Sequence, residues 1–154
     1  MLDFEASDWE GLDGLGEEAL ELLREPAELA VEDALRYLVD EVKDTLGPVW
    51  GPRSGLVYKR SQRGMPHIAS APGEPPAPDN GNLQRSITYE MGEWDGWTIA
   101  GWIGTNLEYA RILEWGGIAG NGARILPRPY FEPTIIRVVQ DVEEILERSL
   151  RAAA

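Results

Sequence analysis

The chain has 154 residues, a length typical of one domain and sufficient for a core of its own. It contains no cysteine and one histidine, which excludes disulfides, a cysteine nucleophile and a zinc site built from cysteine and histidine. The N-terminus is acidic and no apolar run approaches the roughly 20 residues of a membrane span, so we expect neither a signal peptide nor a membrane protein.

The net charge of −13 is concentrated near the N-terminus, where residues 1–46 hold 15 of the 27 acidic residues and three basic ones. Negative charge repels nucleic-acid phosphates, so this region is a poor nucleic-acid-binding surface. Two interpretations stay open. The acids form a solvated helix face that aids solubility, or they form a surface that lies near DNA without adhering to it.

The clearest helical pattern covers residues 26–46, and Gly47-Pro48 predicts its end. Residues 17–24 are good helix formers, but Pro26 predicts a break or a helix start. We therefore expect residues 1–25 to be an acidic arm or short helix and residues 26–154 to be a single domain. The apolar stripe of the long helix consists of Val31, Leu35, Leu38, Val42 and Leu46.

Residues 48–83 are rich in turn formers. Residues 56–60 and 67–70 read as two short strands that could pair. Four prolines in residues 72–78 exclude a helix or a central strand there. Residues 71–81 are therefore either a polyproline-like connector or an excursion that orders on a neighbouring subunit.

A β-hairpin is predicted for residues 86–105. Its strands cover residues 86–91 and 97–105, and Asp95-Gly96 suits a turn with positive φ. Trp97 and Trp102 fall on opposite faces of the second strand, so we expect both faces to be covered.

A glycine-rich loop, residues 116–122, follows the apolar segment 109–115 and precedes residues 128–133. It lacks the Gly-Lys-Ser/Thr of a phosphate-binding loop and the third glycine of a dinucleotide fingerprint. We expect the loop to be disordered in an isolated subunit and to become ordered in an assembly of subunits. We also expect Glu114 and Arg128, at its two ends, to be joined by a salt bridge or hydrogen bond.

The last helix is predicted to begin at Pro133, with Glu132 near its positive end. Its apolar stripe consists of Ile135, Val138, Val139, Val142, Ile145, Leu146 and Leu150.

Three groups of residues are candidates for chemical sites. His67 has no partner with which to build a catalytic or metal site. The acids Glu90, Glu93 and Asp95 crowd a hairpin end, where solvent disfavours the raised pKa that a catalytic acid needs. Arginines 111, 124 and 128 lie among aromatic residues, but the net charge favours packing or an interface over nucleic-acid stacking. We predict no catalytic, cofactor-binding or metal-binding residue.

Four motifs occur in a fixed order. They are Gly81-Asn82-Leu83-Gln84-Arg85-Ser86-Ile87, Gly104-Thr105-Asn106-Leu107-Glu108-Tyr109-Ala110, Leu113-Glu114-Trp115-Gly116, and Arg128-Pro129-Tyr130-Phe131 with Pro133. The set resembles the neck and tail-completion (head–tail joining) proteins of long-tailed double-stranded DNA phages. That family typically shows Gly-x-Leu-Arg-x-Ser-Ile, a Tyr-Ala pair, a Glu-Phe-Gly-Thr-like turn and Arg-Pro-Phe-x-x-Pro between two helices. The resemblance covers roughly residues 28–150, and Gln84, Trp115, Gly117 and Tyr130 depart from the usual residues.

The resemblance implies an α+β fold, with a small antiparallel β-sheet packed against a long helix in the N-terminal half and a C-terminal helix, and with long loops. It implies a structural virion protein and no enzyme or cofactor. Copies would form a ring, expected to be six-fold, at the head–tail junction, and DNA would pass without sequence-specific binding. The implied partners are other copies and the adjacent head-closure and tail-terminator or tail-tube proteins, in the virion and, during assembly, in the host cytoplasm.

Residues 1–46 would then line the DNA channel with negative charge. The expected subunit or partner contacts are Tyr109, Glu114, Trp115, Gly116, Gly117, Gly120, Arg128, Tyr130 and Phe131. Two alternatives stay open: an acidic regulator or DNA mimic that binds a nucleic-acid-binding partner, and a small hydrolase, for which no catalytic set is assembled.

Overall fold

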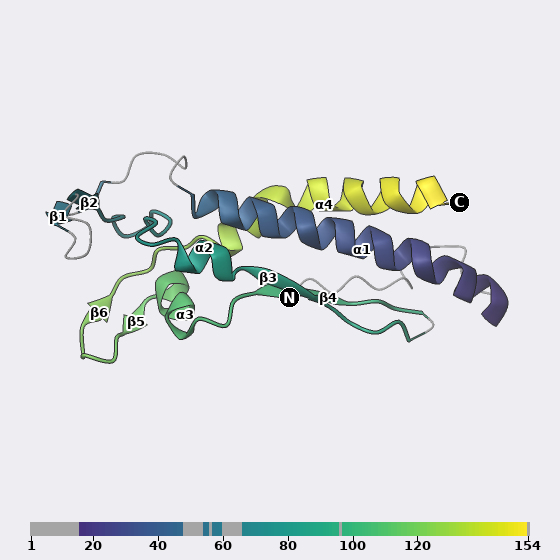
Figure 1. Ribbon diagram of the computed structural model, residues 1–154, viewed down its shortest axis with the longest axis horizontal. Coiled ribbons are helices and arrows are strands. Elements are labelled where there is room, and N and C mark those ends of the chain that lie inside the picture. Colours follow the sequence, from purple (N-terminus) through teal and green to yellow (C-terminus); the bar gives the residue numbers. More distant parts are fainter. Residues whose placement is uncertain (1–15, 48–53, 56, 60–65, 96, 154) are drawn as a thin grey trace. The chain divides into compact units, whose positions relative to one another are not determined.

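The structure is a computed structural model that describes residues 16–47, 54–55, 57–59, 66–95 and 97–153, and its fold is α+β, as expected (Figure 1). The helices are α1 (Glu17–Thr45), α2 (Asn82–Ser86), α3 (Glu108–Trp115) and α4 (Glu132–Ala153). The strands are β1 (Val57–Lys59), β2 (Pro66–Ile68), β3 (Thr88–Met91), β4 (Gly101–Gly104), β5 (Gly117–Ile118) and β6 (Arg124–Ile125).

The described strands form three antiparallel pairs, β1–β2, β3–β4 and β5–β6. In the first, Tyr58 pairs with His67, which confirms the two short strands expected in residues 48–83. In the second, Glu90 pairs with Trp102, which confirms the predicted hairpin. The second strand of that hairpin is shorter than expected, since residues 97–100 lie outside it.

The described residues group into two compact units. Unit 1 contains residues 16–39, 88–104 and 138–153, and unit 2 contains residues 40–87 and 105–137. Helices α1 and α4 contribute residues to both units. The predicted division into residues 1–25 and 26–154 stays a prediction.

Helix α1 runs through Pro26 without a break, so the expected break at this proline is wrong. A proline inside a helix leaves the carbonyl four residues earlier without its amide partner, here that of Leu22. Leu22 is 79% exposed, so water can reach that carbonyl and lower the cost. Arg24 also pairs with Glu28 at 2.8 Å across the proline.

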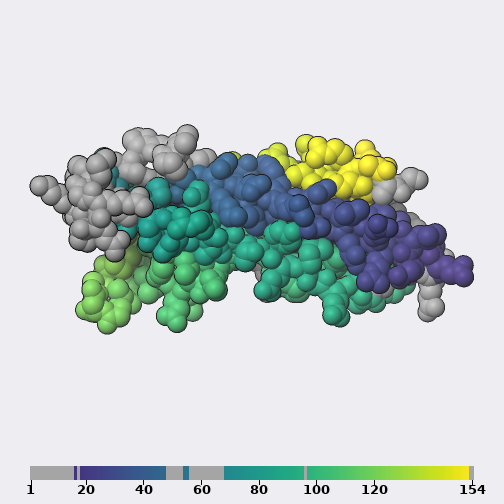
Figure 2. Space-filling view, in the orientation of Figure 1, coloured from purple at the N-terminus to yellow at the C-terminus, as the bar shows by residue number. Residues whose placement is uncertain are grey.

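In unit 1, α1 runs between α4 and the β3–β4 hairpin (Figure 1). The Tyr37 hydroxyl donates to Asp141 on α4 at 2.8 Å. On the other side, the Tyr89 hydroxyl of β3 donates to Glu32 at 2.7 Å. Figure 2 shows the yellow atoms of α4 lying along the blue and purple atoms of α1. The buried apolar residues of unit 1 are Leu20, Ala30, Ala34, Leu35, Leu38, Val39, Ile99, Val138 and Val142.

The turn of the β3–β4 hairpin is held by Asp95. Its carboxylate accepts the backbone N–H groups of Trp97 at 2.9 Å and Thr98 at 2.7 Å. These bonds, with that from the Thr98 hydroxyl, hold the pKa of Asp95 below its usual value. The expectation that both faces are covered is wrong, because Trp97 and Trp102 are both nearly half exposed.

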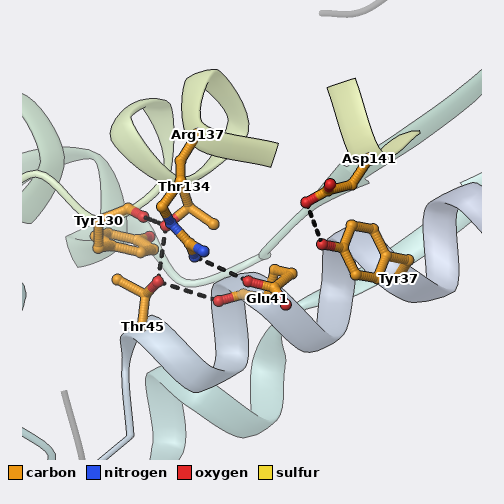
Figure 3. Close-up of polar contacts among 7 residues, drawn as sticks. All are labelled: Tyr37, Glu41, Thr45, Tyr130, Thr134, Arg137 and Asp141. Carbon is orange, nitrogen blue, oxygen red and sulfur yellow. Dashed lines mark hydrogen bonds and ion pairs between the residues drawn. The ribbon is translucent and has the colours of Figure 1, made fainter. Parts of the chain in front are cut away.

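In unit 2, the ends of α1 and α4 meet through a buried polar contact. The hydroxyls of Thr45 and Thr134 lie 2.8 Å apart, and Thr134 also donates to the carbonyl of Tyr130 at 2.7 Å (Figure 3). Nearby, Arg137 pairs with Glu41 at 2.8 Å. The buried apolar residues of unit 2 are Val42, Leu46, Leu83, Ile87, Ala110 and Tyr130.

The proline-rich segment packs on its own chain. The Gly73 N–H donates to the carbonyl of Pro127 at 2.9 Å. The Glu74 carboxylate accepts the N–H of Ala71 at 2.8 Å and also bonds to Ser54. Pro76 is buried. The single chain therefore gives this segment docking contacts, which favours the connector over the excursion to a neighbour.

Candidate interaction surface at the glycine-rich hairpin

The apolar segment 109–115 forms most of α3, a helix that the sequence pattern does not predict. Glu108 lies in the first turn, where a carboxylate favours the positive end of the helix. Ala110 and Glu114 are four residues apart and both buried, so they mark the inward face. Gly116 ends the helix with φ 74° and ψ 178°, a conformation that is nearly restricted to glycine.

The glycine-rich loop forms a tight hairpin within the single chain, whereas the sequence predicts a loop that becomes ordered only on assembly. Gly117 pairs with Ile125, and Ile118 pairs with Arg124. The Ala119 N–H donates to the carbonyl of Ala123 at 2.8 Å, which closes the tip. The glycines thus supply the positive φ values of a turn, 81° at Gly122, while the backbone pairs hold the shape.

A backbone hydrogen bond joins the two segments that flank the hairpin. The Arg128 N–H donates to the carbonyl of Leu113 at 2.7 Å. A β-carbon at Gly116 would lie 2.9 Å from the Ile125 carbonyl oxygen and 3.0 Å from Pro127, so the closing strand passes against this glycine.

Glu114 holds the start of α4. Its carboxylate accepts the backbone N–H groups of Tyr130, Phe131 and Glu132 at 2.9, 3.0 and 3.0 Å. Phe131, the residue before the helix, has no side-chain oxygen to cap it. The carboxylate from α3 supplies the missing acceptor and places negative charge at the positive end of the helix.

The expected contact between Glu114 and Arg128 is wrong. Within the described residues no ion pair joins them. The Arg128 guanidinium donates to the carbonyls of Ser70 at 3.2 Å and Leu126 at 3.1 Å. Three converging N–H groups satisfy the buried carboxylate, while the arginine ties the hairpin to the segment before the prolines.

Tyr130 is the buried aromatic residue at the point where Glu114 binds the backbone. It is 2% exposed and meets the ring of Phe131 edge to face, with centroids 6.2 Å apart. Burial raises the pKa of the Tyr130 hydroxyl above its ordinary value, and the charge of Glu114 adds to the effect.

The expected contact residues divide into two groups. Glu114 and Tyr130 are buried, and Glu114 binds the chain's own backbone, whereas Gly116, Arg128 and Phe131 are half-buried. Tyr109, Trp115, Gly117 and Gly120 face outward. The outward group and its exposed neighbours are therefore the surface available to a partner.

Trp115 is the largest exposed side chain on this surface, with 64% of its area accessible. The Arg111 guanidinium lies 5.9 Å from its ring centroid, a cation–π arrangement one helical turn away. Both residues line a groove of about 430 Å³ that also contains Asn106, Phe131 and Glu132. The groove offers aromatic, cationic and amide groups to a second surface.

Another depression in unit 2 has a volume of about 650 Å³. Proline-rich residues 76–78 line it together with Leu83, Ile112, Ile125 and Arg128. Arg128 already donates to two backbone carbonyls. Among the described residues no three His, Cys, Asp or Glu side chains gather in a way that could hold a metal ion.

No described helix is long and apolar enough to cross a membrane. Comparisons with protein-family models, with curated proteins and with solved structures found no match.

Proposed function

We propose that the protein is a structural component of the head–tail junction of long-tailed double-stranded DNA phages. Copies assemble into a ring that joins head and tail and lets DNA pass. The proposal rests on the order and spacing of the four motifs, and one structural observation supports it most. Glu114 of the third motif binds the backbone of Tyr130 and Phe131 in the fourth.

The other motifs also contact one another within unit 2. The Ser86 hydroxyl of the first motif lies 2.6 Å from the Thr105 hydroxyl of the second. Ala110 of the second motif is buried on the same helix that carries Glu114. Contacts of this kind are a physical reason for the motifs to occur together, because each one fixes the position of the next.

The contact between Glu114 and the start of α4 holds α3 so that an aromatic side chain points outward, where it is available for assembly. Trp115 is exposed while the Glu114 carboxylate before it binds the backbone at the start of α4, so little backbone entropy remains to be lost when Trp115 meets a partner. Aromatic residues and arginine are also the side chains that most often dominate binding energy at interfaces. Trp115 and Arg111 are therefore the proposed centre of a subunit or partner contact.

The experiment measures the mass of the purified full-length chain in solution, alone and mixed with the head-closure and tail-tube proteins of the same phage. We expect a ring with an open centre, seen by electron microscopy. Trp115→Ala is expected to weaken assembly about tenfold or more without lowering the thermal midpoint. Trp102→Ala, an equally large truncation of an exposed tryptophan on unit 1, is the matched control.

A chain that stays monomeric alone and with these proteins, and that is missing from purified virions, would overturn the proposal. A stoichiometric complex with a host DNA-binding enzyme would favour the acidic regulator instead. One observation favours that alternative: α1 exposes acidic residues along its length, namely Glu18, Glu21, Glu25, Asp33, Asp40 and Asp44. Reversal of these charges, with Trp115 intact, would then abolish the complex.

A further inference from the structure

The β5–β6 hairpin has two unlike faces. Ile118 and Arg124 are directly paired, so they lie on one face, and alternation adds Leu126 to it. Ile118 is 72% exposed, Leu126 is 45% exposed, and Arg124 is exposed. Ile125 belongs to the opposite face and lines the depression of unit 2. Ile118, Arg124 and Leu126 together form the hairpin face.

The N-terminal half of α1 carries a second exposed apolar surface. Leu22 is 79% exposed and Leu29 is 54% exposed, and residues seven apart lie on the same side of a helix. Glu25 lies between them, three residues after Leu22 and four before Leu29, and Glu18 lies one turn before Leu22. Both glutamates are exposed. Leu22, Leu29, Glu18 and Glu25 together form the helix face.

The two faces carry complementary charge. Neither Glu18 nor Glu25 has an ion pair among the described residues, whereas the neighbouring Glu21 and Glu28 are both paired with Arg24. Arg124 likewise has no carboxylate partner within the described part of the chain. Each face thus combines two exposed aliphatic side chains with charge of one sign that has no ion-pair partner in the described part of the chain.

The geometry points to a second copy of this chain as the occupant of both faces: the hairpin face of one copy docks on the helix face of the next. This inference rests on the proposed function and names the surfaces of its ring. Ile118 and Leu126 pack against Leu22 and Leu29, and Arg124 pairs with Glu25. Dry contact between the leucines and the isoleucine gives affinity, while the charges fix the orientation.

The contact is heterologous, because the two faces consist of different residues. Each copy therefore keeps one free hairpin face and one free helix face after a single contact. A heterologous contact that repeats around an axis closes into a ring, whereas a self-complementary patch stops at a dimer.

A charge swap tests the contact. Arg124→Glu places acid against acid, and Glu25→Arg places base against base. Each single variant is expected to raise the protein concentration for half-assembly at least about tenfold, and the double variant Arg124→Glu/Glu25→Arg to return within about threefold of the wild type. Assembly is followed by light scattering, in the presence of the neighbouring junction proteins if the ring needs them.

Mixing the two single variants gives a sharper result. The acidic hairpin face of the Arg124→Glu variant meets the basic helix face of the Glu25→Arg variant, and the remaining contacts are wild type in character. We therefore expect the mixture to assemble where neither variant does alone, with equal numbers of the two in each ring by native mass spectrometry. Asp44→Arg on α1 and Arg148→Glu on α4, both at exposed positions outside the two faces, are the matched controls.

Rings that form equally well in all variants, or a double variant no better than the worse single one, would overturn this contact and leave the proposed function standing. A wild-type chain that stays monomeric with every junction protein and is missing from purified virions would remove both. If assembly is restored only because the Glu25→Arg variant forms dimers with itself, the helix faces of two copies pair with each other. That result would overturn the heterologous contact.

Discussion

The carboxylate of Glu114, at the end of α3, accepts a 2.9 Å hydrogen bond from the backbone N–H of Tyr130, just before α4. The same side chain binds the next two N–H groups, so one buried residue serves as the cap of a helix that begins elsewhere in the chain.

Removal of this carboxylate is expected to destabilise the protein strongly. Glu114→Ala leaves three N–H groups without their acceptor in a buried site, at a cost of about 3 kcal/mol or more. Glu114→Gln keeps the volume and one oxygen, so a loss of about 1–2 kcal/mol is expected. Urea unfolding followed by circular dichroism measures both. Glu143→Ala, at an exposed position of α4, is the control, and an equal effect would contradict the capping role.

The buried hydroxyl pair of Thr45 and Thr134 is expected to show coupling. Either single change to valine leaves the other hydroxyl without one of its partners and costs about 1–2 kcal/mol. The double variant removes both groups, so its loss should fall short of the sum by about 1 kcal/mol. A double-mutant cycle in urea gives this number. Strict additivity would mean that the two hydroxyls do not interact.

Two glycines of β4 are expected to respond differently to the same change. A β-carbon at Gly101 would lie 2.4 Å from the buried Leu35 side chain, so Gly101→Ala forces the core to shift and should cost about 1–3 kcal/mol. A β-carbon at Gly104 would meet no described atom within 4 Å apart from its chain neighbours, and Gly104→Ala should be nearly neutral. The thermal midpoints of the two variants decide the matter.

The glycines of the hairpin offer a second such pair. Gly116→Ala places a β-carbon at φ 74° and 2.9 Å from the Ile125 carbonyl oxygen, and about 2 kcal/mol of destabilisation is expected. Gly120→Ala meets open space and has no positive φ, so it should leave stability unchanged. If both variants unfold at the same urea concentration, the turn does not depend on the conformation of Gly116.

Alkaline pH is expected to destabilise the protein through Tyr130. Its folded pKa lies above the unfolded value, so the neutral hydroxyl is favoured in the fold. That contribution is fully present below the unfolded pKa of about 10 and is lost as the pH rises through the folded value. Tyr130→Phe cannot ionise, so its stability relative to the wild type should rise between pH 9 and pH 11. A constant difference across this range would contradict the assignment.

The long elements follow from local patterns that the sequence displays directly. The stripe of α1 is buried at Leu35, Leu38 and Val42 and continues to Leu46 just after the helix, and α4 buries Val138 and Val142. These residues repeat at helical spacing over several turns, so the signal accumulates. By contrast, α2 has five residues and β5 and β6 have two each, too few for a period to emerge.

The partner of Glu114 could not be predicted from charge alone. Arg128 is the obvious counter-ion at the other end of the loop, but matching opposite side-chain charges overlooks the backbone N–H groups as possible donors. The start of α4 carries several N–H donors with a partial positive charge, and they converge on one point. The sequence does hold a usable sign: the residue before the helix is Phe131, which cannot cap it, so an acceptor from elsewhere is needed.

The pattern of apolar residues in the β3–β4 hairpin likewise does not show which side chains are buried. Bulky residues on both faces of the predicted strand 97–105 suggest two covered faces, yet Trp97, which lies before β4, and Trp102, which lies in it, are nearly half exposed. An exposed tryptophan and a buried one have the same hydrophobicity, so only the packed structure shows which of the two a given residue is.

The 2.7 Å bond from the Arg128 N–H to the Leu113 carbonyl closes the base of the hairpin independently of its tip. Because the ends are held, the closure entropy of the loop grows only slowly with length, by about 0.6 kcal/mol for each doubling. Residues 120–122 at the tip are exposed and make few contacts. The tip is thus a place where a peptide tag or a fluorophore can be inserted while the base of the hairpin stays folded, which gives a handle for following the folding of the single subunit.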